Sequence, residues 1–569
     1  MSEATLERET PAAVSPKGEP VSDGSKNLLI HLVPGLLGAA LYVLNNLNVL
    51  HAIFAAPAGY APCGVQRHMD VGEYLAWLEA FKTNWVIPNY QAPWTTSRGL
   101  VMPGLMPIAL LERLLSLPSV VALQLLSFVG YMFVAYAVAH ASRSFFQSRR
   151  QALWGVLLAI CCVPVVCLPG ASHILKGVGD HEGWLKFLLV GDGFFHGLVT
   201  WPFVTLGTAF QLLSMSLLVR YVKAPARRGL LWLACCCFLS ALMHPFEIAV
   251  TVTAVAIVFL REFGWKAQTV GRFALIAAAA GIGLSPHVLE TLLVPWVHEI
   301  SEANSIQLLP NLLLPIIGVP AMVALVLLLL GYPRRASTEI TVLKVWCFSS
   351  FVVFYLPGMP FPIHFLDGIF FAIGFLLVIQ AGELMEEKPA FTGPLLRIGA
   401  LLLLLWSVGA HAMLRLDTWE GGILPQERAG HLSAIAPVEE FATVRWLRQH
   451  ASPEDMVLAT RETAPWLAAV PMHSFASHWL SSELATRPGF EAVRAAFFAG
   501  QLPSNQAHQL LENLGVRYVV IPDGSPAAGY MDRTQQQARL GSWTIYELPG
   551  VHMRPYHDPR IVALGGSAQ

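Results

Sequence analysis

The stretch from Tyr60 to Leu100 reads YAPCGVQRHMDVGEYLAWLEAFKTNWVIPNYQAPWTTSRGL. It is polar and aromatic, and it lies between long apolar runs in a chain of 569 residues, of which 55% are hydrophobic and only 13% are charged. The mean hydropathy is +0.54. This composition excludes an ordinary soluble protein, and the formal net charge of −1 gives no indication of a nucleic-acid partner. We therefore interpret the stretch as a loop held at a membrane surface.

Apolar runs of about 17 to 25 residues recur along the chain, which is the length that a helix needs to cross a bilayer. Lys and Arg cluster between these runs, as at Arg149 and Arg150, and such clusters mark cytoplasmic loops. The alternation predicts a polytopic α-helical membrane protein with about eleven transmembrane helices, an inner N-terminus and an outer C-terminus. The expected spans are 28–53, 119–142, 152–169, 198–222, 229–244, 246–261, 270–297, 309–331, 341–357, 366–384 and 394–414.

The same pattern divides the chain into three parts. Residues 1–26 are polar and are expected to form a disordered cytoplasmic tail. Residues 27–416 form the transmembrane domain, with large outer loops at 54–118 and 170–197. The apolar run at 102–115, MPGLMPIALLERLL, is short and carries Glu112 and Arg113, so we interpret it as an amphipathic or re-entrant segment at the outer surface.

Residues 417–569 are expected to form an extracytoplasmic α/β domain, because polar residues return there and no run is long enough to span a membrane. The patterns VEEFATVRWLRQH (438–450) and HQLLENLG (508–515) predict helices, the second closed by Gly515. The patterns DMVLAT (455–460), VRYVVIP (516–522) and SWTIYEL (542–548) predict strands.

Acids and histidines gather at the outer ends of the spans, where retained charges are candidates for function. Asp70 and Glu73 lie three residues apart, so on a helix that begins near His68 they share one face. The other members of this outer group are Lys176, Asp180, His181, Glu182, His244, Glu247, His364 and Asp367. Such a group could abstract a proton from an acceptor hydroxyl, bind a divalent metal or hold a phosphate.

Simpler interpretations compete with each of these. Asp70 could be only the N-cap of the helix VGEYLAWLEAF, with Glu73 completing a capping box. The GDHEGW segment could be a solvated turn, and His244 to Glu247 a tight turn broken by Pro245. The cysteines show no disulfide or zinc spacing, and no residue is assigned as a metal ligand, so a divalent cation is only a candidate cofactor.

The order of the parts resembles the glycosyltransferase C superfamily, which includes protein O-mannosyltransferases and the aminoarabinose transferase of lipid A. The resemblance rests on HMDVGEYLAWLEA, MPGLMPIALLERLL, MHPFE, HFLDGIFF, VRWLRQHASPEDMVLA, SHWLSSEL and LLENLGVRYVVIP, and it covers most of residues 28–550. An acid in the first outer loop of these proteins acts as general base on the acceptor, and Asp70 matches it. The mannosyltransferases have an adjacent Asp-Glu pair, whereas Val71 follows Asp70 here.

The resemblance implies an inverting membrane glycosyltransferase of the bacterial inner membrane. It would transfer a sugar from a polyprenyl-phosphate donor to a lipid or glycan acceptor on the outer face, within membrane lipids and without nucleic acid. Asp70 and Glu73 are the expected catalytic residues. The expected contacts to the donor phosphate or substrate are Lys176, Asp180, His181, Glu182, His244, Glu247 and His364. Two alternatives are a transporter or flippase of a lipid-linked substrate and an inactive glycosyltransferase-like scaffold in envelope assembly.

Overall fold

The computed structural model describes residues 23–56, 58–67, 69–82, 86–88, 90, 98–100, 103–161, 202–303, 305, 323–387, 394, 398–399, 401–402, 433–460, 470, 473–474, 487–532 and 535–548. The outer loop expected at 170–197 lies outside these residues, as do parts of the spans expected at 152–169, 309–331 and 394–414. The number of spans predicted from the sequence therefore stays a prediction.

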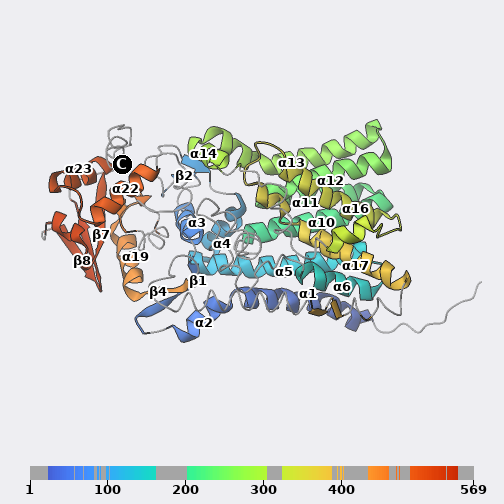
Figure 1. The fold of residues 1–569 in the computed structure, drawn as a ribbon, viewed down its shortest axis with the longest axis horizontal. Coiled ribbons are helices and arrows are strands. Elements are labelled where there is room, and N and C mark those ends of the chain that lie inside the picture. Colours follow the sequence, from blue (N-terminus) through green and yellow to red (C-terminus); the bar gives the residue numbers. More distant parts are fainter. Residues whose placement is uncertain are drawn as a thin grey trace, which may run out of the picture.

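Long helices form one half of the elongated molecule and run close to its long axis (Figure 1). They are α1 (Asp23–Asn45), α5 (Ser119–Phe145), α6 (Arg149–Cys161), α10 (Pro202–Lys223), α11 (Arg227–Met243), α12 (Pro245–Phe263), α13 (Ala267–Leu293), α16 (Thr338–Phe354) and α17 (Ile369–Glu387). The shorter helix α2 (Leu47–Ala55) lies beside β1 (Tyr60–Arg67) and β4 (Ser433–Pro437) (Figure 1). In the described part of the chain, four helical segments are long and apolar enough to cross a membrane: α5, α10, α13 and His364–Glu387.

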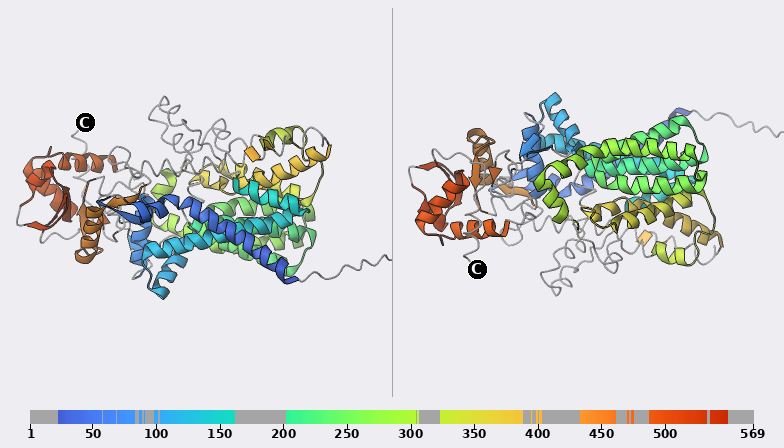
Figure 2. Two further views of the ribbon diagram at one scale, coloured as in Figure 1. Left: turned by 90° about the horizontal axis from the view of Figure 1, so that it is seen from below. Right: turned by 90° about the horizontal axis from the view of Figure 1, so that it is seen from above.

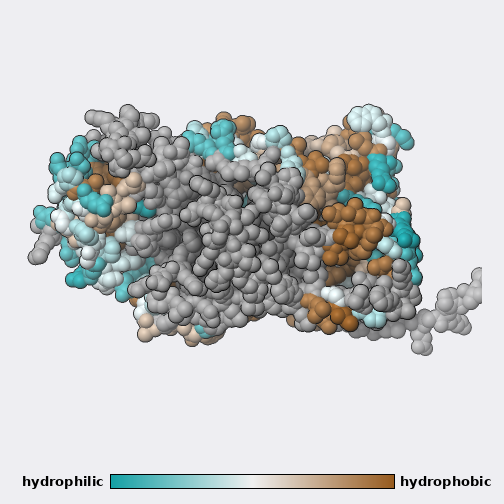
Figure 3. All heavy atoms as spheres, in the orientation of Figure 1, coloured by the Kyte–Doolittle hydropathy of each residue, from teal (hydrophilic) through white to brown (hydrophobic). Residues whose placement is uncertain are grey.

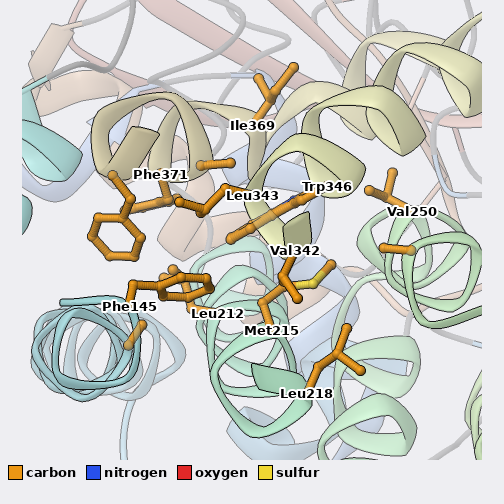
Figure 4. Packing of buried hydrophobic residues seen from close by; sticks show 14 of the residues in the cluster. Phe145, Leu212, Met215, Leu218, Val250, Val342, Leu343, Trp346, Ile369 and Phe371 are labelled. Atoms are coloured by element: carbon orange, nitrogen blue, oxygen red, sulfur yellow. The ribbon is translucent and has the colours of Figure 1, made fainter. Parts of the chain in front are cut away.

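The interior of this helical bundle is built around Trp346, which is fully buried. Figure 4 shows Met215 and Leu212 of α10 and Val342 of α16 beside its ring. On the face shown in Figure 3, patches of hydrophobic side chains lie on the outside of the bundle, and hydrophilic side chains lie over the C-terminal elements and at the far end of the bundle. A helix that is apolar on all sides is typical of a membrane span, because lipid replaces water around it.

The described residues of the segment predicted as the first outer loop (54–118) lie between the bundle and the C-terminal elements in both further views (Figure 2). It contains β1 (Tyr60–Arg67), α3 (Met69–Phe81), the antiparallel pair β2 (Val86–Pro88) and β3 (Arg98–Leu100), the short 3-10 helix η1 (Pro103–Leu105), and α4 (Met106–Leu115). Helix α4 has 10 residues, too few to span a bilayer. It buries Ile108 and exposes Leu110 and Leu114, an apolar outer face that suits a helix lying at a membrane surface.

The C-terminal elements form a mixed five-stranded sheet of order β6-β5-β7-β9-β8. Strand β5 (Met456–Leu458) is parallel to β6 (His473–Ser474) and β7 (Val516–Pro522), while β9 (Trp543–Glu547) is antiparallel to β7 and β8 (Gln536–Leu540). Helices α19 (Val438–His450), α22 (Arg487–Phe498) and α23 (Ser504–Leu514) accompany the sheet. Gly515 follows α23 with a φ of 64°, so it ends the helix in the left-handed conformation that glycine adopts easily.

Strand β1 of the first loop pairs in antiparallel fashion with β4 (Ser433–Pro437), which leads directly into α19. Ala61 lies opposite Ala436 in this register. A single hydrophobic cluster contains Trp77 of α3, Leu447 of α19 and Tyr518 of β7. The first outer loop and the C-terminal sheet therefore pack together, although they are far apart in the sequence.

Candidate active site

Helix α3 begins at Met69, so Asp70 lies in its first turn. One alternative from the sequence was that Asp70 is the N-cap of this helix. The helix already includes Asp70, so Asp70 is a helical residue and not the N-cap. The side chain of Asp70 lies outside the described residues. Glu73 is completely buried.

His244 and Glu247 form a buried hydrogen-bonded pair where α11 meets α12. His244 is the extended residue between the two helices, with φ −149° and ψ 117°, and Pro245 starts α12. The ring atom Nδ1 of His244 lies 2.6 Å from Oε2 of Glu247. Both side chains are nearly inaccessible to water, with exposed fractions of 4% and 1%. The turn that the sequence suggested is therefore present, and it also positions two ionisable groups.

Helix α10 donates two hydrogen bonds to Glu247 of this pair. The hydroxyl of Thr208 donates to Oε1 of Glu247 at 3.0 Å, and the amide of Gln211 donates to the Glu247 carbonyl at 3.2 Å. Gly207 permits the close approach, because a Cβ atom there would lie 2.7 Å from Cβ of His244. Both oxygens of Glu247 therefore have hydrogen-bond partners, which fixes the carboxylate.

His364 approaches His244 from a second segment, the 3-10 helix η3 (Pro362–Leu366). Its Nδ1 lies 3.1 Å from Oδ2 of Asp367. The two imidazole rings are 5.3 Å apart at an angle of 88°, and Phe246 stacks on His364 at 5.0 Å. The His364 side chain is 27% exposed, whereas that of Asp367 is 4% exposed. His364 is therefore the accessible member of this histidine cluster, defined as His244, Glu247, His364 and Asp367.

Aromatic side chains connect the histidine cluster to α3. Tyr74 of α3 packs edge to face on Phe203 of α10, with ring centroids 5.6 Å apart. Phe203 lies 6.1 Å from the His244 ring. Tyr74 is one residue beyond Glu73 and one helical turn beyond Asp70. Phe203 thus lies between the helix that carries both predicted catalytic acids and the His244 ring of the histidine cluster.

A second group of polar side chains lies between α3, α4 and α5, outside the spans. Lys82 and Ser119 each donate to a carboxylate oxygen of Glu79 at 2.8 Å. Burial acts to raise the pKa of Glu79, but these two hydrogen bonds hold it below its usual value. Glu112 is 1% exposed, and burial raises its pKa to about 7. Glu79 and Glu112 therefore differ in charge near neutral pH.

The predicted site residues are thus only partly brought together by the described part of the chain. His244, Glu247 and His364 lie in one cluster, to which α3 is connected through the ring of Phe203. Four residues of the second outer loop lie outside the described residues: Lys176, Asp180, His181 and Glu182. Thr208 and Gln211 were not predicted, because single uncharged polar residues within an apolar span give no distinctive signal.

The sequence also did not single out His287, which lies near the histidine cluster. It follows Pro286 inside α13, and its Nε2 lies 3.3 Å from the carbonyl oxygen of Leu242, two residues before His244. A proline inside a predicted span, followed by an ionisable residue, could have singled it out.

No protein-family model matches the chain, and no curated protein matches it. Among solved structures, ArnT from Cupriavidus metallidurans in the apo state superimposes with a TM-score of 0.51 over 92% of this chain and 98% of that chain, at 13% sequence identity. Apo Archaeoglobus fulgidus oligosaccharyltransferase gives a TM-score of 0.48, 13% identity, and coverages of 88% and 70%. Mycobacterial arabinofuranosyltransferase AftD gives 0.46, 14% identity, and coverages of 91% and 42%.

The similarity to ArnT extends over nearly the whole length of both chains, so this chain shares the fold of ArnT. The resemblance seen in the sequence is confirmed at the level of the fold. An identity of 13% carries no information about substrate or about individual residues.

Proposed function

We propose that the chain is a bacterial membrane glycosyltransferase that moves a sugar from a polyprenyl-phosphate donor to a lipid or glycan acceptor on the extracytoplasmic face. The observation that carries this proposal is the series of ring contacts from Tyr74 to Phe203 and from Phe203 to His244, which connects α3 to the histidine cluster. It relates a helix with two acids to the imidazoles of His244 and His364 at one end of the bundle. The fold supports the proposal, because glycosyltransferase C proteins of known structure are membrane glycosyltransferases that use lipid-linked donors.

Asp70 is the proposed general base. Its carboxylate takes the proton of the acceptor hydroxyl while that oxygen attacks the anomeric carbon of the sugar. The bond between the anomeric carbon and the phosphate oxygen breaks, and polyprenyl phosphate leaves with the bonding electrons. A single displacement of this kind inverts the configuration at the anomeric carbon. Glu73, buried one turn along the same helix face, orients Asp70 or shares its role.

The departing phosphate gains negative charge, so the site needs groups that stabilise it. His364 is suited to this role because it is the accessible member of the histidine cluster. His244 and Glu247 lie directly behind it and fix its surroundings. We also keep the residues of the second outer loop, Lys176, Asp180, His181 and Glu182, as proposed donor contacts.

The proposed topology follows from the basic clusters between the spans. It places the N-terminus in the cytoplasm and the first outer loop, the histidine cluster and residues 417–569 outside. A lipid-linked donor has its polyprenyl chain in the bilayer and its sugar at the surface. A site where the spans meet the outer loop is therefore the place where such a donor and a water-exposed acceptor can meet.

The test is a transfer assay with purified protein and polyprenyl phosphate that carries a radiolabelled sugar. Replacing Asp70 with Asn should lower the rate by about 10²- to 10⁴-fold, the usual contribution of a general base. Glu79→Gln is the matched control, because it removes a carboxylate from the same helix and should leave most activity. Full activity in Asp70→Asn would remove Asp70 from the mechanism.

The same preparation distinguishes the alternatives. Movement of the labelled lipid across vesicle bilayers without transfer would indicate a flippase. Binding of the donor lipid without turnover on a broad panel of acceptors would indicate a scaffold.

A further inference from the structure

We propose that His244, His364 and Asp367 bind a divalent cation of the zinc type, whose open coordination position accepts an oxygen of the donor phosphate. Only the assignment of that phosphate rests on the proposed function. The metal site itself rests on side chains that lie in the described part of the chain. One possible ligand atom from each of the three residues lies within 4.8 Å of the others.

The spacing suits a tetrahedral ion after small side-chain rotations. Zinc binds imidazole nitrogens and carboxylate oxygens at about 2.0 to 2.2 Å, which puts neighbouring ligand atoms about 3.3 Å apart. Three ligand atoms within 4.8 Å therefore need to move inward by roughly one ångström. His244 and His364 come from separate segments, the α11 to α12 junction and η3, so an ion would join two parts of the bundle.

The surroundings of His244 are those of a metal-binding histidine. Such a residue donates its second ring N–H to a carboxylate, which fixes the tautomer and leaves the other nitrogen free to bind the metal. Nδ1 of His244 lies 2.6 Å from Glu247, and Thr208 holds the opposite oxygen of Glu247. Nε2 is then the metal-binding nitrogen of His244. Glu247 is a positioning residue and does not itself bind the ion.

Charge balance favours a dication at this place. The cluster contains two carboxylates, Glu247 and Asp367, with exposed fractions of 1% and 4%. When both carboxylates are ionised and both imidazoles are neutral, two negative charges are uncompensated in a poorly solvated site, which is costly. Both carboxylates would also repel a phosphate placed directly against the histidines. A bound dication compensates both charges and gives a phosphate oxygen a positive partner.

The donor set indicates which ion binds. Two imidazole nitrogens and one carboxylate oxygen suit zinc, while magnesium and calcium prefer oxygen ligands only. Three protein ligands leave the fourth tetrahedral position open, as in catalytic zinc sites. The His364 side chain is 27% exposed, so a phosphate oxygen can approach the cluster from the side of His364.

The experiment uses the full chain in lipid nanodiscs, purified without a polyhistidine tag and stripped with EDTA. Cobalt(II) replaces zinc as the probe, because its visible absorption reports tetrahedral binding, and elemental analysis gives the stoichiometry. We expect one ion per chain in the parent protein. His364→Ala and Asp367→Asn should abolish stoichiometric binding. Glu247→Gln should weaken binding by about 10- to 100-fold while keeping one ion per chain, as expected of a group that only orients a ligand.

His298→Ala is the matched control, because His298 is 55% exposed on α14 (Pro295–Ala303) and pairs with Glu302. It should bind cobalt like the parent protein. Size-exclusion profiles and metal-free melting temperatures show whether each variant is folded. If His364→Ala fails to fold, the graded loss in Glu247→Gln decides the outcome. Absence of a stoichiometric ion in the parent, or equal affinity in Glu247→Gln and the parent, would overturn the site.

Metal binding and sugar transfer can fail separately. Stoichiometric cobalt binding in a protein that transfers no sugar would uphold the site and count against the glycosyltransferase. Sugar transfer that continues at full rate in EDTA would uphold the glycosyltransferase and count against a metal ion that binds the donor phosphate.

Discussion

Replacing Glu112 with Gln should stabilise the protein above neutral pH and remove part of its pH dependence. Glu112 is 1% exposed, and burial raises its pKa from 4.5 to about 7. A carboxyl group whose pKa is raised in the folded state contributes its full stability below the unfolded pKa and loses it as the pH rises through the folded value. The parent protein should therefore become less stable between about pH 5 and pH 8, the window set by these two pKa values.

The magnitude follows from linkage. A pKa difference of about 2.5 corresponds to about 3 kcal/mol, and about 2 kcal/mol of this falls between pH 5.5 and pH 8. Gln has nearly the same shape and does not ionise, so the free energy of unfolding of Glu112→Gln should lack this component. Surface carboxylates contribute far less.

The assay is denaturation of the purified protein in detergent at a series of pH values, followed by tryptophan fluorescence. The quantity compared is the difference between variant and parent at each pH, in which the other titrating groups cancel. Glu302→Gln is the control, because the side chain of Glu302 is 71% exposed. Parallel pH curves for the parent and Glu112→Gln would refute the reasoning, since Glu112 would then have the same pKa in both states.

Two further predictions concern packing and an ion-pair network. Gly104→Ala should destabilise the protein by about 1–3 kcal/mol, because the added Cβ atom would lie 2.5 Å from the carbonyl oxygen of Met243 and 2.6 Å from Cβ of Phe203. The control in the same melting assay is Gly59→Ala. Its Cβ atom meets open space but its φ is 84°, so this variant reports backbone strain without crowding. Arg517→Ala should cost about 3–5 kcal/mol, because it leaves the carboxylate of Asp455, 5% exposed, without the guanidinium that contacts it at 3.0 Å. Arg517→Lys should restore part of that stability, and equal melting of both variants would contradict the role of the ion pair.

The local sequence pattern was sufficient to predict several helices and strands. Helix α19 occupies residues 438–450 as predicted, and β7 occupies 516–522, because period 3.6 and a short buried β-branched run are properties of consecutive residues. Gly515 ends α23 as expected. The run at 102–115 contains a ten-residue helix, which agrees with its rejection as a span. The helix around Asp70 was also expected, with its start within a residue or so of the observed one.

The pairing of distant segments was not available from local pattern. Strand β1 was not expected, and neither was its pairing with β4, because a strand's partner depends on closing a long loop and on which faces remain uncovered. The aromatic contacts from Tyr74 to His244 have the same origin. Thr208 acquires its role only because α10 packs beside α12.

The sequence by itself determined that this protein is helical and membrane-embedded, and which polar residues stand apart from the apolar runs, since hydropathy and charge are read residue by residue. The tertiary structure decided which of those residues meet. It assembled His244, Glu247, His364 and Asp367 into one cluster and connected α3 to that cluster through Phe203. The physical reason is that the burial of these side chains and the electrostatic interactions between them depend on contacts between distant segments, and those contacts form only when the helices pack.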